Sequence, residues 1–223
     1  MEVKKHEKFD GIFMIKKNLA TINLLPGKKV YGEELVRIGK VEYRIWDLWR
    51  SKPAAAIKKG LKYFPIKRNC KILYLGVASG TTATHFSDIV GKEGLIYGIE
   101  ISERVLRELI PHAEGRGNII PILADARKPE DYSDLVLEKV DVIYCDVASP
   151  DEIDLFLRNS EKFLKPRGHG MIAVKARSID VLKKPGEIYK EARKKFEEKF
   201  EILDFVELDP FDKDHGFFVL EFK

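Results

Sequence analysis

Residues 71–82 read KILYLGVASGTT, an apolar run that passes through a turn with two glycines into a helical pattern. A near-continuous apolar run of this length is typical of a strand buried on both faces, as in a parallel sheet. Gly76 and Gly80 allow the backbone to turn sharply and to approach a ligand without a Cβ in the way. Open α/β sheets bind ligands at the carboxyl ends of their strands, so this segment predicts both a fold class and a binding site.

The rest of the chain repeats this alternation of apolar runs and helical patterns. The seven predicted strands cover residues 71–76, 94–100, 119–123, 140–146, 171–176, 201–208 and 217–222. Helices are predicted near residues 81–90, 102–112, 151–164 and 185–199. Such an order, with mostly right-handed crossovers, predicts a doubly wound α/β sheet. The loop at 209–216 is too short for a helical crossover, so we expect the last strand to run antiparallel to its neighbour. This ending resembles the Rossmann-like sheet of S-adenosylmethionine-dependent methyltransferases.

Residues 1–50 are predicted to form a small β-rich module that precedes the main domain at 51–223. Short apolar stretches at 11–15, 20–24 and 41–46 are separated by turns expected at Asn18, at Pro26-Gly27 and at Gly39, and indicate antiparallel strands. The module is too short to build its own core and should pack on the main domain. A helix is expected to start after Ser51, a plausible cap, with Pro53 in its first turn.

Length and composition restrict the class of protein. A chain of 223 residues with 44% hydrophobic and 34% charged residues fits one folded domain with a modest extra module. No apolar run approaches the ~20 residues that span a bilayer, and the mixed charges of residues 1–8 do not fit a signal peptide. We therefore expect a cytoplasmic protein with no membrane contact. Cys70 and Cys145 have no metal-binding spacing, which favours a reduced core without metal.

Positive charge is concentrated in the first part of the chain. Residues 1–50 hold eleven Lys/Arg against seven Asp/Glu, a surplus of four that equals the net charge of the whole chain, +4. Residues 48–87 contain no acidic residue but eight basic ones. Such a stretch is either a surface for a polyanion or a solvated face whose counter-charges come from elsewhere in the fold.

Three successive strand ends offer groups that suit a nucleoside. Glu100 ends the second strand, twenty residues after Gly80, where its carboxylate can accept hydrogen bonds from ribose hydroxyls. Asp125 follows the third strand, where it can meet an adenine amino group. The turn lacks the GxGxxG spacing that places a helix N-terminus on a pyrophosphate, which argues against NAD and for S-adenosyl-L-methionine. The predicted cofactor-binding residues are Gly76, Ala78, Gly80, Thr81, Thr82, Glu100, Ile101, Asp125, Ala126 and Asp146.

Several segments together resemble one family over essentially the whole chain. They are RSKPAAAI at 50–57, YLGVASGTT at 74–82, GIE at 98–100, CDVASP at 145–150, IAVKA at 172–176 and DHG at 214–216. These segments are similar to the motifs of fibrillarin in its short archaeal form, including alanine at position 78, where many methyltransferases carry glycine. The resemblance implies an enzyme that methylates ribose 2'-hydroxyls of ribosomal RNA and transfer RNA. It also implies three partners in one complex: a Nop-domain scaffold protein, a kink-turn-binding ribosomal protein and a C/D box guide RNA.

Lys52, Asp146, Lys175 and His215 match the catalytic set of that family. A ribose hydroxyl is a poor nucleophile, so methyl transfer needs a positioned proton acceptor and an in-line approach to the sulfonium methyl. Our hypothesis makes Lys175 the general base, with Asp146 holding it and helping to place the methyl donor. Lys52 and His215 would orient the ribose and a neighbouring phosphate. We expect the carboxylate between two ammonium groups to stay ionised, and the two lysines to lower each other's pKa.

Two other functions remain open from the sequence alone. One is a methyltransferase for small molecules or proteins, and the other is a catalytically silent scaffold subunit that only holds RNA. The sequence shows neither an aromatic-rich sheet face nor an RGG tract, so we expect the isolated chain to bind RNA weakly and to take its target sites from its partners. The pattern does not identify the target nucleotides, the oligomeric state or the surface that contacts the scaffold.

Overall fold

The structure, a computed structural model, describes residues 2–223, and Met1 lies outside them. The chain begins with an antiparallel sheet of five strands in the order β1-β2-β3-β5-β4. These strands are β1 (Val3–Lys5), β2 (Ile12–Ile15), β3 (Asn18–Ile22), β4 (Leu35–Ile38) and β5 (Val41–Ile45). We call this sheet the N-terminal sheet. Three of its strands, β2, β3 and β5, fall on the predicted apolar stretches, whereas β1 and β4 were not predicted.

The main sheet has seven strands in the order β11-β12-β10-β9-β6-β7-β8. They are β6 (Lys71–Leu75), β7 (Leu95–Glu100), β8 (Ile119–Leu123), β9 (Val140–Cys145), β10 (Leu164–Lys175), β11 (Phe200–Glu207) and β12 (His215–Phe222). The pairs from β10 through β9, β6 and β7 to β8 are parallel, and β12 runs antiparallel to both β10 and β11. The predicted doubly wound fold with an antiparallel last strand is therefore confirmed.

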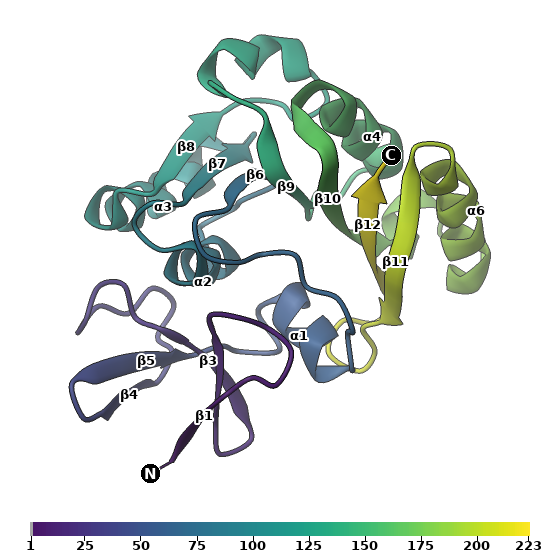
Figure 1. The fold of residues 1–223 in the computed structure, drawn as a ribbon. Helices are drawn as coiled ribbons and strands as arrows, with labels where there is room; N and C mark the ends of the chain where they lie inside the picture. Colours follow the sequence, from purple (N-terminus) through teal and green to yellow (C-terminus); the bar gives the residue numbers. More distant parts are fainter. Residues whose placement is uncertain (1) are drawn as a thin grey trace.

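Helices cover both faces of the main sheet (Figure 1). They are α1 (Lys52–Lys58), α2 (Thr81–Val90), α3 (Glu103–Arg116), α4 (Glu152–Phe163), α5 (Ala176–Ile179) and α6 (Pro185–Glu197), with a 3-10 turn η1 at Pro129–Leu135. One core cluster joins α1, α2, α3 and part of the N-terminal sheet to one face, and a second cluster joins η1, α4 and α6 to the other. Successive strand residues point to opposite faces, so a strand buried on both sides needs the continuous apolar runs found here.

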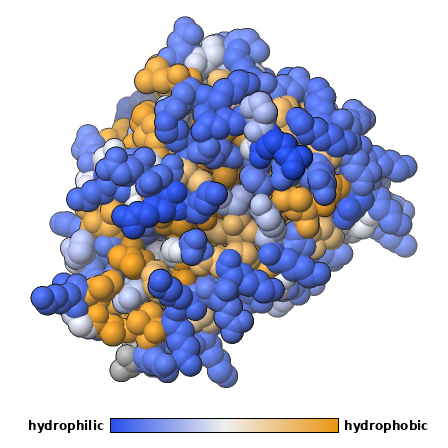
Figure 2. Space-filling view, in the orientation of Figure 1, coloured by the Kyte–Doolittle hydropathy of each residue, from blue (hydrophilic) through white to orange (hydrophobic). Residues whose placement is uncertain are grey.

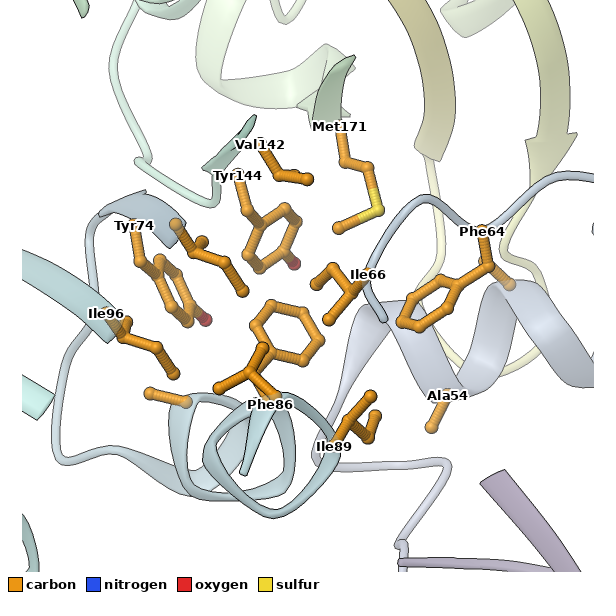
Figure 3. Close-up of a cluster of buried hydrophobic side chains, with 14 of the residues drawn as sticks. Ala54, Phe64, Ile66, Tyr74, Phe86, Ile89, Ile96, Val142, Tyr144 and Met171 are labelled. Carbon is orange, nitrogen blue, oxygen red and sulfur yellow. The ribbon is translucent and has the colours of Figure 1, made fainter. Parts of the chain in front are cut away.

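Aromatic side chains fill the core on the α2 side (Figure 3). Phe86 of α2 is fully buried and contacts Tyr74 of β6 and Tyr144 of β9, with ring centroids 5.9 and 5.5 Å apart. Trp46, at the end of the N-terminal sheet, is 1% exposed and packs edge-on against Phe86. The N-terminal sheet thus leans on the main domain, as its length requires. The division of the chain at residue 50 stays a prediction, because the two sheets share this core.

The structure corrects three details of the predicted elements. Strand β10 begins at Leu164 and not at 171. Leu164 already pairs with Val140 of β9, and the pairing of the two strands resumes at His169 after an irregularity between Leu164 and His169. Ser51 is the N-cap residue of α1, but its hydroxyl does not cap the helix; it is hydrogen-bonded to the Thr82 hydroxyl at 2.9 Å. The turn before β3 is formed by Lys16 and Lys17, with Lys16 at a positive φ of 57°, whereas Asn18 already belongs to the strand.

Hydrophilic residues cover most of the face shown in Figure 2, and hydrophobic surface remains in separate patches, one of them over the N-terminal sheet at the lower left. Within residues 2–223, none of the helices combines the length and apolarity needed to cross a membrane.

Candidate active site

A cavity of about 380 Å³ opens at the carboxyl ends of β6, β7, β8 and β9. Its walls come from the turn after β6 and from the residues that end or follow the other three strands. The lining residues are Gly76, Ala78, Ile99, Glu100, Ile101, Ala124, Asp125, Ala126, Arg127, Asp146, Val147, Ala148, Ser149 and Leu155. Seven of the predicted cofactor-binding residues are among them. The segment at 147–149 was missed, although it directly follows Asp146 in the sequence.

The turn after β6 brings the backbone close to its neighbours. Gly76 has a φ of 78°, and a Cβ on it would lie 3.0 Å from the backbone oxygen of Asp146, so a side chain there would be both strained and crowded. Ala78 also has a positive φ, of 50°, and its N–H donates to Glu100 Oε2 at 3.0 Å. Glu100 Oε1 accepts from the N–H of Ser102 at 2.9 Å. Both oxygens of Glu100 keep a lone pair for a ligand, since a carboxylate oxygen can accept two hydrogen bonds.

Asp125 lies on the opposite wall and is held by Arg127. The guanidinium of Arg127 contacts both oxygens of Asp125, at 3.0 Å from Nε and 2.7 Å from Nη2. These hydrogen bonds are the main reason that the pKa of Asp125 is lowered. Asp125 is therefore an ionised acceptor whose partner cation is already neutralised.

Three predicted cofactor-binding residues do not line this cavity. The Thr82 hydroxyl faces Ser51, and Thr81 lines a separate small pocket together with Arg50. Gly80 is the N-cap of α2, with a φ of 93°, and packs against Leu109 of α3. A direct role of these three in cofactor binding stays a prediction.

At the edge of the cavity, Asp146 lies between two lysines that are distant in sequence. Asp146 follows β9, Lys175 ends the adjacent strand β10, and Lys52 begins α1. Asp146 Oδ1 is 2.8 Å from Lys175 Nζ and 3.1 Å from Lys52 Nζ. Lys175 Nζ also donates to the backbone oxygen of Asp146 at 2.7 Å. The three side chains are only 12–18% exposed, so little water screens them.

The ion pairs around Asp146 shift the pKa values of Asp146 and Lys52. Burial alone would raise the pKa of Asp146, but the ammonium groups of Lys175 and Lys52 outweigh it and hold that pKa below its usual value. The prediction of an ionised Asp146 is confirmed. The prediction that the lysines lower each other's pKa is wrong for Lys52: burial opposes its charge, yet the carboxylates of Asp146 and Asp212 prevail and raise its pKa.

His215 reaches the group through Asp212, a residue that the sequence analysis missed. His215 starts β12 and lies directly opposite Lys175 in the antiparallel pairing of β10 and β12. Asp212 Oδ2 is 3.7 Å from Lys52 Nζ, and its Oδ1 is 3.9 Å from His215 Nδ1. We call Lys52, Asp146, Lys175, Asp212 and His215 the site cluster.

The imidazole of His215 has a defined orientation. Its Nδ1 is 2.7 Å from the backbone oxygen of Lys213. A carbonyl oxygen only accepts, so Nδ1 must carry a hydrogen. In the neutral ring Nε2 is then an acceptor, and no protein partner is recorded for it within the part of the chain that the structure describes. His215 therefore presents a free acceptor next to the two lysines.

Glu152 is a second residue that the sequence analysis missed. It is fully buried in the first turn of α4, and its Oε1 accepts from the backbone N–H of Lys175 at 2.7 Å. Its Oε2 is buried without a hydrogen-bond partner among residues 2–223. Burial raises the pKa of Glu152 to about 8. At neutral pH Glu152 is therefore protonated and adds no second negative charge beside Asp146.

The donor set of the cavity fits a nucleoside with a sulfonium and no phosphate. Glu100, Asp125 and Asp146 offer carboxylate oxygens, and Arg127, the cation of the lining, is engaged by Asp125. Such walls accept hydrogen bonds from hydroxyl and amino groups and attract positive charge, but they repel a pyrophosphate. Within the described residues no group of three or more His, Cys, Asp or Glu side chains is placed to hold a metal ion.

The acid-free stretch at 48–87 does not form one surface. Lys52 belongs to the site cluster and Arg50 lines the separate small pocket with Thr81, whereas Lys67 and Arg68 line a pocket with Lys165 and Arg167, at the start of β9 and β10 and so at the opposite end of the sheet. Three of its cations, Arg50, Lys52 and Lys71, are paired with acids outside the stretch, as in the Lys71–Glu138 ion pair. The interpretation that counter-charges come from elsewhere in the fold thus applies to the paired cations, and a surface for a polyanion stays a prediction for the others.

Comparison with known proteins adds independent information. The fibrillarin family model matches residues 3–223. A curated relative from Pyrococcus furiosus, named fibrillarin-like rRNA/tRNA 2'-O-methyltransferase, is 54% identical over 99% of this chain and 98% of its own length.

Two solved structures are similar over nearly the whole chain. A fibrillarin from Aeropyrum pernix in complex with natively bound S-adenosyl-L-methionine has a TM-score of 0.92 and 46% identity, and covers 99% of this chain and 98% of its own. A fibrillarin in a fibrillarin/Nop5p complex has a TM-score of 0.87 and 40% identity, and covers 99% of this chain and 100% of its own.

Proposed function

The chain belongs to the fibrillarin family, and on that premise we propose that it methylates ribose 2'-hydroxyls of ribosomal and transfer RNA. Its cofactor is S-adenosyl-L-methionine, the molecule bound in the similar Aeropyrum pernix structure. The observation that carries the proposal is the carboxylate of Asp146 between two ammonium groups, 2.8 and 3.1 Å away, at the edge of a cavity lined by Glu100 and Asp125. A nucleoside pocket and a proton-handling group therefore meet at one point.

Different residues of the cavity are expected to bind different parts of the cofactor. Glu100 is the expected acceptor for the ribose hydroxyls of the cofactor, and Asp125 is the expected acceptor for the adenine amino group. Asp146 supplies negative charge to the sulfonium end. When bound there, the cofactor supplies an electrophilic methyl group on sulfur.

The site cluster handles the substrate hydroxyl. Lys175 first releases the proton that its ammonium form carries beside Asp146, and its neutral amine then accepts the 2'-hydroxyl proton as the oxygen forms its bond to the methyl carbon and the carbon–sulfur bond breaks. Asp146 holds Lys175 through the 2.8 Å ion pair. His215 Nε2 is free to accept a hydrogen bond from the ribose, and Lys52 lies where it can neutralise a neighbouring phosphate. Such positioning converts a weak nucleophile into one aligned for displacement.

The proposal extends to the partners. The Nop5p complex of a similar fibrillarin supports a Nop-domain scaffold protein as a direct partner of this chain. A kink-turn-binding ribosomal protein and a C/D box guide RNA would complete the complex and select the target nucleotide. We also place the protein in the cytoplasm, in line with its two buried, unpaired cysteines, Cys70 and Cys145, which suit a reducing compartment.

Methyl transfer from labelled S-adenosyl-L-methionine tests this function. The full chain is assembled with scaffold protein, kink-turn-binding protein and guide RNA, and the target RNA carries either ribose or 2'-deoxyribose at the selected nucleotide. We expect label in the ribose substrate and none in the deoxy substrate. Equal labelling of both, or labelling of a protein component instead, would contradict the proposal.

A further inference from the structure

An aromatic pair of one exposed residue, Trp49, and one half-buried residue, Phe211, lies beside the site cluster. Trp49 is 65% exposed, and its ring packs edge-on against Phe211 with centroids 5.1 Å apart and planes at 65°. The other tryptophan, Trp46, is 1% exposed and stacks on His85 in the core. Trp49 contributes little to that core, and a large aromatic surface left in water is unfavourable unless something covers it.

The pair is linked to the site cluster at both of its residues. Trp49 stands three positions before Lys52, and Phe211 directly precedes Asp212. Lys52 and Asp212 are themselves 3.7 Å apart, which ties the two segments together at this point. The backbone N–H of Trp49 donates to Asp47 Oδ1 at 2.8 Å, and this hydrogen bond fixes the backbone that carries the indole. The aromatic surface is thus held in place at the rim of the site.

The charge next to the pair suits a nucleic acid strand. Arg50, the residue after Trp49, is 59% exposed; its guanidinium lies 5.8 Å from the centre of the Tyr31 ring and 3.9 Å from Asp47, which leaves donors for another anion. A ribose that reaches Lys175 and His215 brings its own base and two phosphates with it, each within one nucleotide of the site cluster. Aromatic rings bind bases of any sequence by stacking, and a neighbouring cation binds the phosphate.

Resting on the proposed function, we infer that Trp49 and Phe211 form a stacking platform for a base of the substrate RNA, at or next to the nucleotide that is methylated. The platform makes no hydrogen bonds to base edges and is therefore indifferent to sequence, as an enzyme whose targets are chosen by a guide requires. It supplies the RNA-binding aromatic group that the sequence analysis did not find, because Trp49 and Phe211 are 162 positions apart in the chain.

Fluorescence of the purified full chain tests the platform directly. Single-stranded oligoribonucleotides are titrated against the wild type and against Trp49→Phe, which retains only the buried Trp46. We expect quenching of the wild type by base-containing oligomers, little quenching by an abasic oligomer of equal charge, and little response of Trp49→Phe. Equal quenching by the abasic oligomer would overturn the inference, because phosphate binding alone would then explain it.

Methylation in the assembled complex gives the second measurement. Trp49→Ala is expected to raise KM for the target RNA about 5–100-fold, the usual effect of losing one stacked base, while cofactor affinity and scaffold binding stay unchanged. Trp49→Phe should restore most of the loss, and Leu137→Ala, which changes an 80% exposed side chain elsewhere, should have no effect. An unchanged KM in Trp49→Ala would overturn the platform.

Other outcomes separate the platform from its alternatives. If Trp49→Ala weakened scaffold binding and left KM for RNA alone, the pair would be a protein contact and the inference would fail. If no variant and no wild-type complex methylated RNA, the proposed function would fail, and the fluorescence titration would still decide whether Trp49 stacks on bases.

Discussion

Two groups of charged side chains in this molecule are both held together by ion pairs, but they have different roles. One is the site cluster. The other, which we call the junction cluster, consists of Glu33, Arg44, Asp88 and Arg116 and joins the N-terminal sheet to α2 and α3. Its side chains are at most 1% exposed, and its ion pairs measure 2.7 Å from Arg44 to Glu33, 2.9 Å from Arg44 to Asp88 and 2.6 Å from Arg116 to Asp88.

The two groups differ in their access to a ligand. In the part of the chain that the structure describes, the junction cluster leaves Arg116 Nε without a hydrogen-bond partner, but this atom is buried. Asp88 also accepts from the Thr21 hydroxyl at 2.7 Å and from the N–H of Leu24 at 3.0 Å, so its two oxygens are engaged on all sides. Site-cluster side chains are instead 12–35% exposed, and one of them, Asp146, lines the cavity. Closed charge networks fix the position of secondary structure, whereas open ones keep a donor or acceptor for a ligand. Substitutions in the two clusters should therefore affect different measurements.

The largest expected effect is that of Lys175→Ala on the rate. Removal of a general base typically costs about 10²–10⁴-fold, so single-turnover methylation in the assembled complex should slow by that factor. Urea unfolding should show a smaller loss than for Asp88→Asn, since Asp146 keeps its ion pair with Lys52.

Lys165→Ala is the matched control for that experiment. Lys165 lies at the other end of the same strand, is 41% exposed and pairs with Asp141 at 2.6 Å. Its loss should leave the methylation rate within a factor of two. A Lys175→Ala enzyme that methylated at the wild-type rate would remove the base from our scheme.

Asp88→Asn should have the largest effect on stability. It leaves two buried guanidinium groups, Arg44 and Arg116, without their shared carboxylate. Breaking a buried pair in this way costs about 3–5 kcal/mol, which urea unfolding measures directly. Asp154→Asn, at an exposed ion pair with Lys195, should cost less than about 1 kcal/mol. An equal decrease in the free energy of unfolding in both variants would mean that the burial of the junction cluster does not make its ion pairs more important for stability than an exposed pair.

Most of the main sheet could be predicted from the sequence, because strands buried on both faces need continuous apolar runs and those runs are visible. Strands β1 and β4 could not, since Val3–Lys5 and Leu35–Ile38 are short and take their pairing from neighbouring strands. The extension of β10 was hidden by Pro166 and Gly168, which ordinarily indicate a turn.

The site was predictable where a residue ends a strand and follows a motif, as Asp146 and Lys175 do. Asp212 lies in a loop without a pattern, and the one available signal was its place three residues before His215. Glu152 was missed for a physical reason: an acidic residue in the first turn of a helix is ordinarily exposed, where it interacts favourably with the helix dipole. Only the tertiary fold buries this one.

Glu152→Gln extends the comparison between the two clusters. Glu152 is fully buried, like the side chains of the junction cluster, but its carboxyl group contacts the backbone of Lys175 in the site cluster. Its pKa is about 8 in the folded chain and near the ordinary 4.5 in the unfolded chain. Folding therefore takes up a proton between these values, so the free energy of unfolding should fall as pH rises from about 4.5 to about 8.

The glutamine keeps an acceptor for the Lys175 N–H but has no proton to lose. We expect Glu152→Gln to match the wild type near pH 5 and to be roughly 4 kcal/mol more stable near pH 9, measured by urea unfolding at both pH values. Identical pH profiles for the two proteins would show that Glu152 is already ionised in the folded state.

The smallest expected effect belongs to His215→Asn. An orienting hydrogen bond contributes about 1 kcal/mol, so kcat/KM for the target RNA should fall by about 5–10-fold, while the pH dependence of the rate stays as in the wild type. The opposite result is equally informative. A loss of more than about 100-fold together with a flattened pH profile would transfer the proton to His215 Nε2, the acceptor without a recorded protein partner among residues 2–223, and would leave Lys175 as a positioning residue beside Asp146.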